Sequence, residues 1–282
     1  MKTKLLILLL LTSLTTGCIT PEQPDDQISD DRISVIVSIP PQKEFVESIG
    51  KEKVSVSVMI PPGASPVTYE PGPGQLRGFS RAELYVRIGH IPFEKAWMDE
   101  IAAANPDMEI LDSSEDIEII ENDPHIWLSP ALVRLQVEHI AGSLIEIDPD
   151  NKDYYIRNKE SYLKDLNDLD ADIRKNLSGI HNRKFMIFHP AWGYFAREYR
   201  LEQIPIEVEG KEPSAADLAR LVDTAKANNI TIVFAAPQFN PESARVIAEE
   251  IGGTVISIDP LAEDCAANMR AVSGILSRYM AS

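Results

Sequence analysis

Cysteine is almost absent from this sequence. The 282 residues include two cysteines, Cys18 near the N-terminus and Cys265 near the C-terminus. Because Cys18 belongs to a segment that we expect to be processed, Cys265 has no partner with which to form an intramolecular disulfide. We interpret Cys265 as a small apolar residue at the start of the last helix.

Basic residues are scarce relative to acidic ones. The chain has 27 Lys and Arg against 44 Asp and Glu, which gives a formal net charge of −17. No basic stripe offers a surface to phosphate groups, so we expect no nucleic-acid partner. A strongly acidic protein is suited to meeting cations, although solubility alone would explain this balance.

Long apolar runs are confined to the N-terminus. Lys2 and Lys4 precede the apolar run Leu5–Leu11, and small or polar residues follow as far as Gly17. This layout is typical of an export signal and is too short to span a bilayer. The step from Gly17 to Cys18 resembles a lipoprotein cleavage site, and the alternative is ordinary cleavage with an incidental cysteine.

We therefore expect residues 1–17 to be an export signal peptide and residues 18–32 to be a flexible tether, anchored to membrane lipid through Cys18. The tether is rich in Pro, Gln, Asp and Ser, a composition that favours a solvated segment. The expected location is outside the cytoplasm, at the cell surface or in the periplasm.

From Ile33 onward, short runs of β-branched residues alternate with segments of helical periodicity. Such alternation is typical of an α/β fold in which helices cover parallel sheets. We expect two α/β lobes, residues 33–148 and 179–282, joined by a linking helix within 149–178. The predicted strands are 33–39, 54–60, 84–88, 108–111, 185–188, 203–208, 231–235 and 254–258, and the predicted helices are 42–49, 93–104, 132–147, 193–199, 214–228, 241–251 and 265–279.

The linking segment contains no Gly or Pro between Asn151 and Leu177. Asp148-Pro149-Asp150 supplies a helix start, and Ser178-Gly179 supplies a stop. A helix of this length would reach about 40 Å. We interpret it as a rigid connection between the lobes that limits hinge motion, because no sustained apolar heptad supports the alternative of a coiled-coil arm.

Two of the five histidines lie where a ligand site is expected. His189 directly follows the predicted strand 185–188, and Asp259 follows the strand 254–258 in the same way. His125 lies in the loop before helix 132–147. Ligand sites of open parallel sheets lie beyond the carboxyl ends of the strands, so all three side chains are expected to face one cleft. Two imidazoles and a carboxylate suit zinc, manganese or iron(II).

The other histidines are weaker candidates. His139 in mid-helix and His181 in a loop are interpreted as surface residues. His90 ends the strand 84–88 on the ligand side of the sheet, so it is a reserve ligand, although a structural role is the simpler interpretation. Gln238, after the strand 231–235, could orient a metal ligand by a hydrogen bond without contacting the metal itself.

Motifs of catalysis are missing from this sequence. There is no nucleophile elbow, phosphate loop, dinucleotide fingerprint or His-Glu-x-x-His pair. We therefore expect a binding protein and no enzyme. The alternative is a metal-dependent hydrolase that uses an open coordination position, which hydrolysis by the purified protein would reveal.

At these residues the chain resembles the zinc/manganese solute-binding proteins of ABC transporters, the TroA-like family. The resemblance covers essentially everything after about Ser34, and its motifs occur in family order. They are Pro-Pro-Gly-Ala-Ser-Pro at 61–66, Tyr-Glu-Pro at 69–71, Ile-Gly-His-Ile-Pro-Phe-Glu at 88–94, Asp-Pro-His-Ile-Trp at 123–127, Phe-His-Pro-Ala-Trp-Gly-Tyr-Phe at 188–195, Glu-Gly-Lys-Glu-Pro-Ser at 209–214, Pro-Gln-Phe at 237–239 and Asp-Pro-Leu at 259–261.

The resemblance implies two α/β lobes joined by one long helix, with a metal ion bound between them. The family usually takes four ligands from these segments: a histidine after the Gly-Ala-Ser-Pro turn, the histidines that match His125 and His189, and the aspartate that matches Asp259. Here the first position is Val67, which cannot coordinate a metal.

A site that lacks this ligand could accept water or recruit His90, Tyr69 or Glu70. His189 favours zinc over manganese, because manganese-selective relatives tend to have glutamate there. The expected function is capture of zinc, or of manganese or iron(II), and its delivery to a membrane permease by a monomer. The alternative is a diverged member that binds another ligand or serves adhesion or metal sensing.

Overall fold

The computed structural model describes residues 31–207 and 210–280. The expected signal peptide, Cys18 and nearly all of the expected tether lie outside the described residues. No helix of the described part is long and apolar enough to cross a membrane.

The first half of the chain forms a parallel sheet of four strands in the order β2-β1-β3-β4. Short β-branched runs make these strands, and the helices that follow them begin at Pro40, Pro73, Pro92 and Pro130, where the missing N–H costs no hydrogen bond. The elements are β1 Ile33–Val37, α1 Pro40–Gly50, β2 Val54–Val58, α2 Pro73–Gly78, β3 Leu84–Arg87, α3 Pro92–Ala104, β4 Glu109–Asp112 and α4 Pro130–Ile147, with short 3₁₀ turns at Lys51–Lys53, Phe79–Arg81 and Ile126–Leu128.

The second half repeats this arrangement, with four parallel strands in the order β6-β5-β7-β8. In each sheet the second strand is added on one side of the first strand and the later strands on the other side. The switch points therefore lie between β1 and β3 and between β5 and β7, and open α/β sheets bind ligands at such points. The elements are β5 Lys184–Ile187, α6 Gly193–Glu198, β6 Glu202–Pro205, α7 Ala215–Ala227, β7 Ile232–Ala235, α8 Glu242–Glu250, β8 Thr254–Ser257 and α9 Cys265–Met280.

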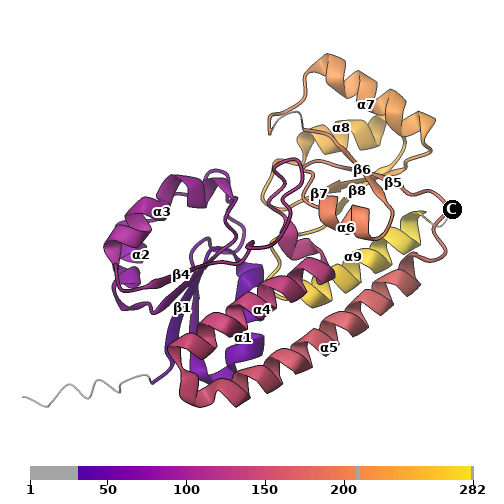
Figure 1. The fold of residues 1–282 in the computed structure, drawn as a ribbon. Coiled ribbons are helices and arrows are strands. Elements are labelled where there is room, and N and C mark those ends of the chain that lie inside the picture. Colours follow the sequence, from indigo (N-terminus) through magenta and orange to yellow (C-terminus); the bar gives the residue numbers. More distant parts are fainter. Residues whose placement is uncertain (1–30, 208–209, 281–282) are drawn as a thin grey trace, which may run out of the picture. The chain divides into compact units, whose positions relative to one another are not determined.

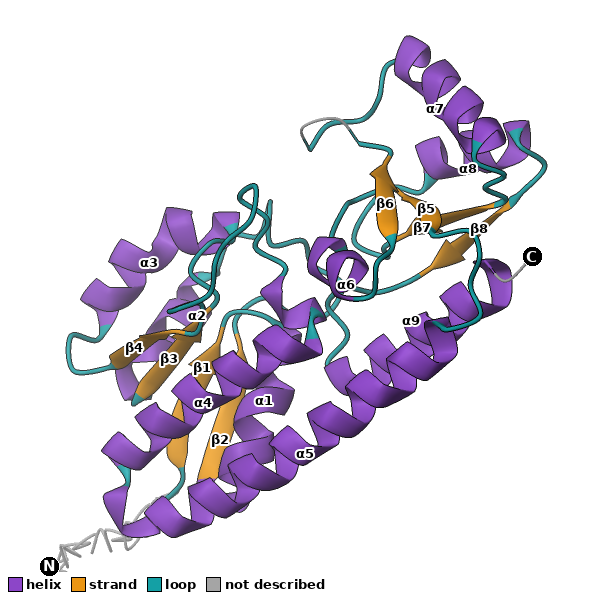
Figure 2. Ribbon diagram, turned by 45° about the vertical axis from the view of Figure 1, so that its right-hand side comes forward, coloured by secondary structure: helices purple, strands orange, loops and turns teal. Residues whose placement is uncertain are grey.

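The helix α5, Lys152–Leu177, links the two sheets and follows a 3₁₀ turn at Pro149–Asn151. Its 26 residues span about 39 Å. It packs against α1 and α4 from the first half and against α9 from the second (Figure 1), and Figure 2 shows α5 and α9 side by side. Its buried face is the apolar stripe Tyr155, Tyr162, Leu166, Leu169, Ile173 and Leu177. The predicted α/β class with two parallel sheets and one long helix is confirmed.

One apolar cluster extends from the first sheet through α5 and α9 to β5 and β7, and a smaller one lies between the second sheet and α7 and α8. Cys265 is buried at the start of α9, as predicted, and its Sγ donates to the carbonyl of Trp127 at 3.3 Å. The structure differs from prediction at several strand and helix ends and in one additional helix. The strand expected to reach Val208 ends at Pro205, and α2 was not expected because Gly72, Gly74 and Gly78 make its segment resemble a loop.

Glu44 of α1 joins the two halves through its carboxylate. It accepts hydrogen bonds from the backbone N–H groups of Cys265 and Ala266, at the start of α9, and from the hydroxyl of Tyr162 in α5 at 2.7 Å. An anion at a helix N-terminus is stabilised by the unpaired N–H groups and by the helix dipole. Glu44 therefore fixes three helices at one point, although burial raises its pKa.

We predict that Glu44→Ala lowers the free energy of unfolding by about 2 kcal/mol or more, because it leaves two N–H groups and a hydroxyl without their acceptor. Urea denaturation monitored by circular dichroism measures this change. Glu47→Ala, at an exposed position of the same helix, is the matched control. Equal stability of the two variants would contradict the assigned role of Glu44.

A second buried carboxylate shapes the turn after β3. Glu94 is 1% exposed and accepts hydrogen bonds from the N–H groups of Ile88 at 2.8 Å and Gly89 at 2.6 Å. Gly89 has a φ of +91°, and a Cβ there would lie 2.6 Å from Oδ1 of Asp112. Burial raises the pKa of Glu94 from 4.5 to about 7, against the lowering effect of its hydrogen bonds.

Because this pKa is higher in the folded protein than in the unfolded chain, Glu94 stabilises the fold most below pH 4.5, and this contribution is lost as the pH rises through about 7. We predict that the difference in unfolding free energy between wild type and Glu94→Gln falls by on the order of 3 kcal/mol from pH 4.5 to pH 8. Chemical denaturation across this range measures it. A difference that is constant or that grows with pH would contradict the assignment.

Candidate metal centre

His125 and His189 meet with their Nε2 atoms 3.3 Å apart. His189 lies two residues beyond the end of β5, and His125 lies in the loop between β4 and α4. Their rings are arranged edge to face, with centroids 5.1 Å apart. The structure thus brings together two of the three ligands that the sequence predicts.

Each histidine is held from behind by a carboxylate. Nδ1 of His125 is 2.6 Å from Oδ1 of Asp123, and Nδ1 of His189 is 2.9 Å from Oε1 of Glu207. A carboxylate accepts a hydrogen bond, so these contacts place a proton on each Nδ1, and a ring that is neutral then carries its lone pair on Nε2. Burial lowers the pKa of His125, which favours the neutral ring, although Asp123 acts in the opposite direction.

Two lone pairs that face each other at this distance repel unless a proton or a cation lies between them. Two nitrogen ligands of a tetrahedral zinc ion, each bound at 2.0–2.1 Å, are about 3.3 Å apart. The Nε2 separation of 3.3 Å therefore matches the geometry that two histidine ligands of zinc require. Carboxylate partners of this kind fix the ring orientation of metal-binding histidines and raise their basicity.

Aromatic rings and a glycine complete the support of the pair. Phe239 stacks on His189 at 4.5 Å between centroids, and Trp127 packs against His125 at 5.0 Å. Gly193 at the start of α6 leaves room for Asp123, because a Cβ at this position would lie 2.5 Å from Oδ2 of Asp123. The backbone of Gly193 is helical, so the close approach of Asp123, and not a positive φ, explains why glycine occupies this position.

The loop of His125 is fixed to the second half of the chain. The hydroxyl of Tyr194 in α6 donates to the carbonyl of Asp123 at 3.0 Å and accepts from the N–H of Ile120. Nε1 of Trp127 donates to the carbonyl of Pro260 at 2.7 Å. His125 is therefore positioned largely by contacts with α6 and the loop after β8.

Asp259 follows β8 but does not join the histidine pair in this structure. Its Oδ1 accepts from Nε2 of Gln238 at 2.7 Å and from the N–H of Leu261 at 2.8 Å. Gln238 thus contacts the third predicted ligand. Within residues 31–207 and 210–280, no group of three or more His, Cys, Asp or Glu side chains is close enough to hold a metal ion.

A cavity of about 220 Å³ opens on the pair, and its lining includes Val67, His90, Gln238, and Pro260 beside Asp259. Tyr69 and Glu70, the other suggested replacement ligands, do not line it. The Tyr69 hydroxyl donates to Oε1 of Gln75 at 2.7 Å, and Glu70 is exposed.

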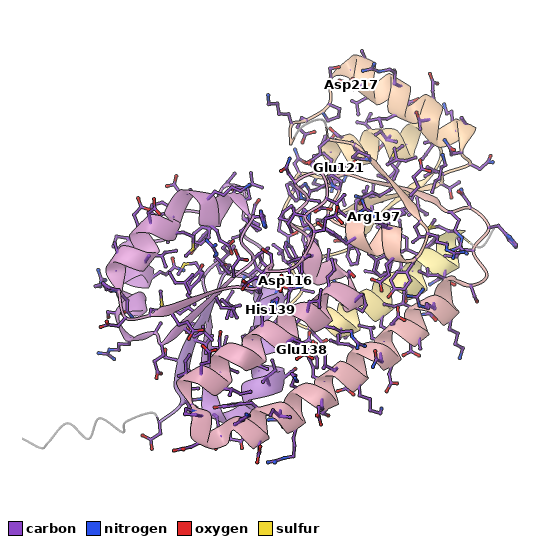
Figure 3. All side chains as sticks on the ribbon, in the orientation of Figure 1. Asp116, Glu121, Glu138, His139, Arg197 and Asp217 are labelled. Carbon is purple, nitrogen blue, oxygen red and sulfur yellow. The ribbon has the colours of Figure 1, made fainter. Side chains whose placement is uncertain are left out.

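A larger cavity of about 850 Å³ is also lined by both histidines of the pair. Its lining includes Glu121 and Arg197, which are labelled in Figure 3, together with Asp123 and Glu207. His139 lies on α4 (Figure 3) and His181 is an exposed loop residue, and neither lines a cavity next to the pair.

Sequence reasoning did not identify the carboxylate partners of the two histidines. Asp123 could have been found, because an Asp two residues before a His can accept from both its N–H and its ring, and the N–H of His125 does donate to Oδ1 of Asp123 at 2.9 Å. Glu207 gives no local signal. It reaches His189 because β6 pairs with β5 and the N–H of Glu207 bonds to the carbonyl of Phe188 at 3.1 Å.

Comparison with known proteins identifies the family of this chain. The family model for ZnuA, the periplasmic component A of the zinc-uptake complex, matches residues 35–272. The high-affinity zinc uptake system protein ZnuA of Bacillus subtilis (strain 168) is 32% identical in an alignment of 245 positions, which covers 79% of this chain and 76% of that protein. The manganese-binding lipoprotein MntA of Halalkalibacterium halodurans is 25% identical, over 87% of this chain and 84% of that protein.

Solved structures show the same likeness. A crystal structure of ZnuA is 48% identical with a TM-score of 0.87, covering 88% of this chain and 99% of that one. A ZnuA deletion mutant with zinc bound is 47% identical with a TM-score of 0.86, covering 89% and 99%. The chain therefore belongs to the ZnuA family, the metal-binding solute-binding proteins of zinc and manganese uptake systems, which are not enzymes.

Proposed function

We propose that this protein captures zinc between the sheets of residues 33–148 and 179–282 and delivers it to the membrane permease of an ABC importer. The observation that carries the proposal is the pair of Nε2 atoms 3.3 Å apart, each on a ring whose Nδ1 faces a carboxylate. A metal cation between two neutral rings in this arrangement would be bound by both Nε2 atoms.

The proposed ligands are His125, His189 and Asp259. Pro260, the residue after Asp259, lines the cavity, and a movement of this loop would have to bring a carboxylate oxygen of Asp259 to the pair. Two neutral imidazoles and one carboxylate suit zinc best, with manganese and iron(II) next. The relatives named for zinc and for manganese support this order.

Delivery requires that the ion be held reversibly by a protein that stays near its permease. Export, acylation of Cys18 and attachment to membrane lipid would keep the protein there, as the lipoprotein names of two relatives suggest. The rigid contacts of α5 and Glu44 favour loop and side-chain movements over a wide hinge opening during loading and release. We propose that it acts as a monomer.

One observation favours a second candidate function. Val67 lines the cavity with 55% of its surface exposed, and it offers no ligand atom. A diverged member that binds another ligand, or that serves adhesion or metal sensing, would have this property. Measured affinity for metal ions separates the two candidates.

We expect chelator-treated protein to bind one zinc ion with submicromolar affinity, more tightly than manganese or iron(II), in isothermal titration calorimetry. His189→Ala is expected to abolish this binding, because it removes one of the two facing nitrogens. His181→Ala, at an exposed position outside the cavity, is the matched control. Absence of any metal binding tighter than micromolar would contradict the proposal of an importer component.

Glu207→Gln tests the partner behind His189. The amide keeps the size of the side chain but removes the charge that fixes the ring proton on Nδ1, so we expect zinc affinity to fall about 10–100-fold with one ion still bound. Competition with a fluorescent chelator measures the affinity. Glu202→Gln, at an exposed position on β6, serves as control, and equal affinities of the two variants would count against this role.

A further inference from the structure

His90 differs from the other two histidines of the cavity. It is half-buried at the end of β3 and lines the same cavity as His125 and His189. Neither of its ring nitrogens makes a hydrogen bond to another residue of the described chain, whereas both rings of the pair are held by carboxylates. Among the described residues that line this cavity, His90 is the only one besides His125 and His189 with an imidazole, carboxylate or thiol group.

The backbone that carries His90 is fixed. Glu94 holds the N–H groups of Ile88 and Gly89, and the positive φ of Gly89 directs the chain past the carboxylate of Asp112. Asp112 is in turn bonded to Ser114. The turn therefore presents His90 from a constant position while its ring remains free to rotate.

His90 shares one wall of the cavity with Val67. The N–H of Phe93 donates to the carbonyl of Pro66 at 3.1 Å, and the ring of Tyr69 packs against that of Phe93 at 5.8 Å. These contacts fasten the loop of Val67 to the turn of His90. The imidazole of His90 can thus approach the pair from the same side of the cavity as Val67, whose side chain offers no ligand atom.

We propose that His90 is a metal ligand of this protein and supplies a third nitrogen to the ion held by His125 and His189. The inference rests on the proposed capture of zinc by that pair. Because the three rings are not grouped in this structure, binding requires the His90 ring to turn toward the pair. The ion then links the loop after β3 to the loop after β5.

The geometry distinguishes His90 from the other replacements suggested by the sequence. Tyr69 has its hydroxyl engaged by Gln75, Glu70 is exposed, and neither lines the cavity. Lys95, which also lines the cavity, offers an ammonium group with no acceptor, which would repel a metal ion. Water in the place of His90 is the competing account.

The test compares His90→Ala with His181→Ala in the full mature chain. Zinc affinity is measured by chelator competition, and the ligand set is read from the visible absorption of the cobalt(II) complex. We expect His90→Ala to lower zinc affinity by about tenfold or more and to change the cobalt bands, because one nitrogen ligand is lost. His181→Ala leaves both unchanged. Equal melting temperatures without metal show that each variant is folded.

A second variant makes the assignment specific. If His90 acts from the wall it shares with Val67, the double variant Val67→His/His90→Ala regains most of the lost affinity. Wild-type affinity and an unchanged cobalt spectrum in His90→Ala would overturn the role of His90 and leave zinc capture standing. Absence of zinc binding by the wild-type protein would overturn both.

Discussion

The interaction on which the rest of the structure depends is the approach of two imidazole nitrogens, Nε2 of His125 and Nε2 of His189, to 3.3 Å. Asp123 and Glu207 hold the far sides of these rings, so the lone pairs face each other. Two neutral rings in this arrangement repel each other unless a proton or a cation lies between the two nitrogens. The arrangement persists because packing and hydrogen bonds outside the pair fix both rings.

Those outer contacts explain much of the fold. His189 is placed by the end of β5 next to β7, at the position where strand order reverses, and Phe239 from the loop after β7 stacks on it. His125 has no strand of its own, and its loop is fixed by Tyr194 and Trp127 to α6 and to the loop after β8. Helix α5 packs against helices of both halves, and Glu44 of α1 accepts hydrogen bonds at the start of α9.

The sequence predicts most of this fold, because its signals are local. Alternating β-branched and helical segments and a long segment without Gly or Pro before Gly179 each reflect chain geometry. The candidate ligands after strand ends follow from the rule for parallel sheets. Glu207 was not predictable, because only the pairing of β5 with β6 brings it to His189. The separation of Asp259 from the pair likewise depends on tertiary contacts with Gln238 and Leu261.

The central claim is that the histidine pair binds the ion directly, and X-ray absorption at the zinc edge tests it most directly. The stoichiometric zinc complex should show a first shell of nitrogen and oxygen at about 2.0–2.1 Å, with the outer-shell scattering of two or more imidazoles. An oxygen-only shell, or a shell without imidazole scattering, would contradict the account.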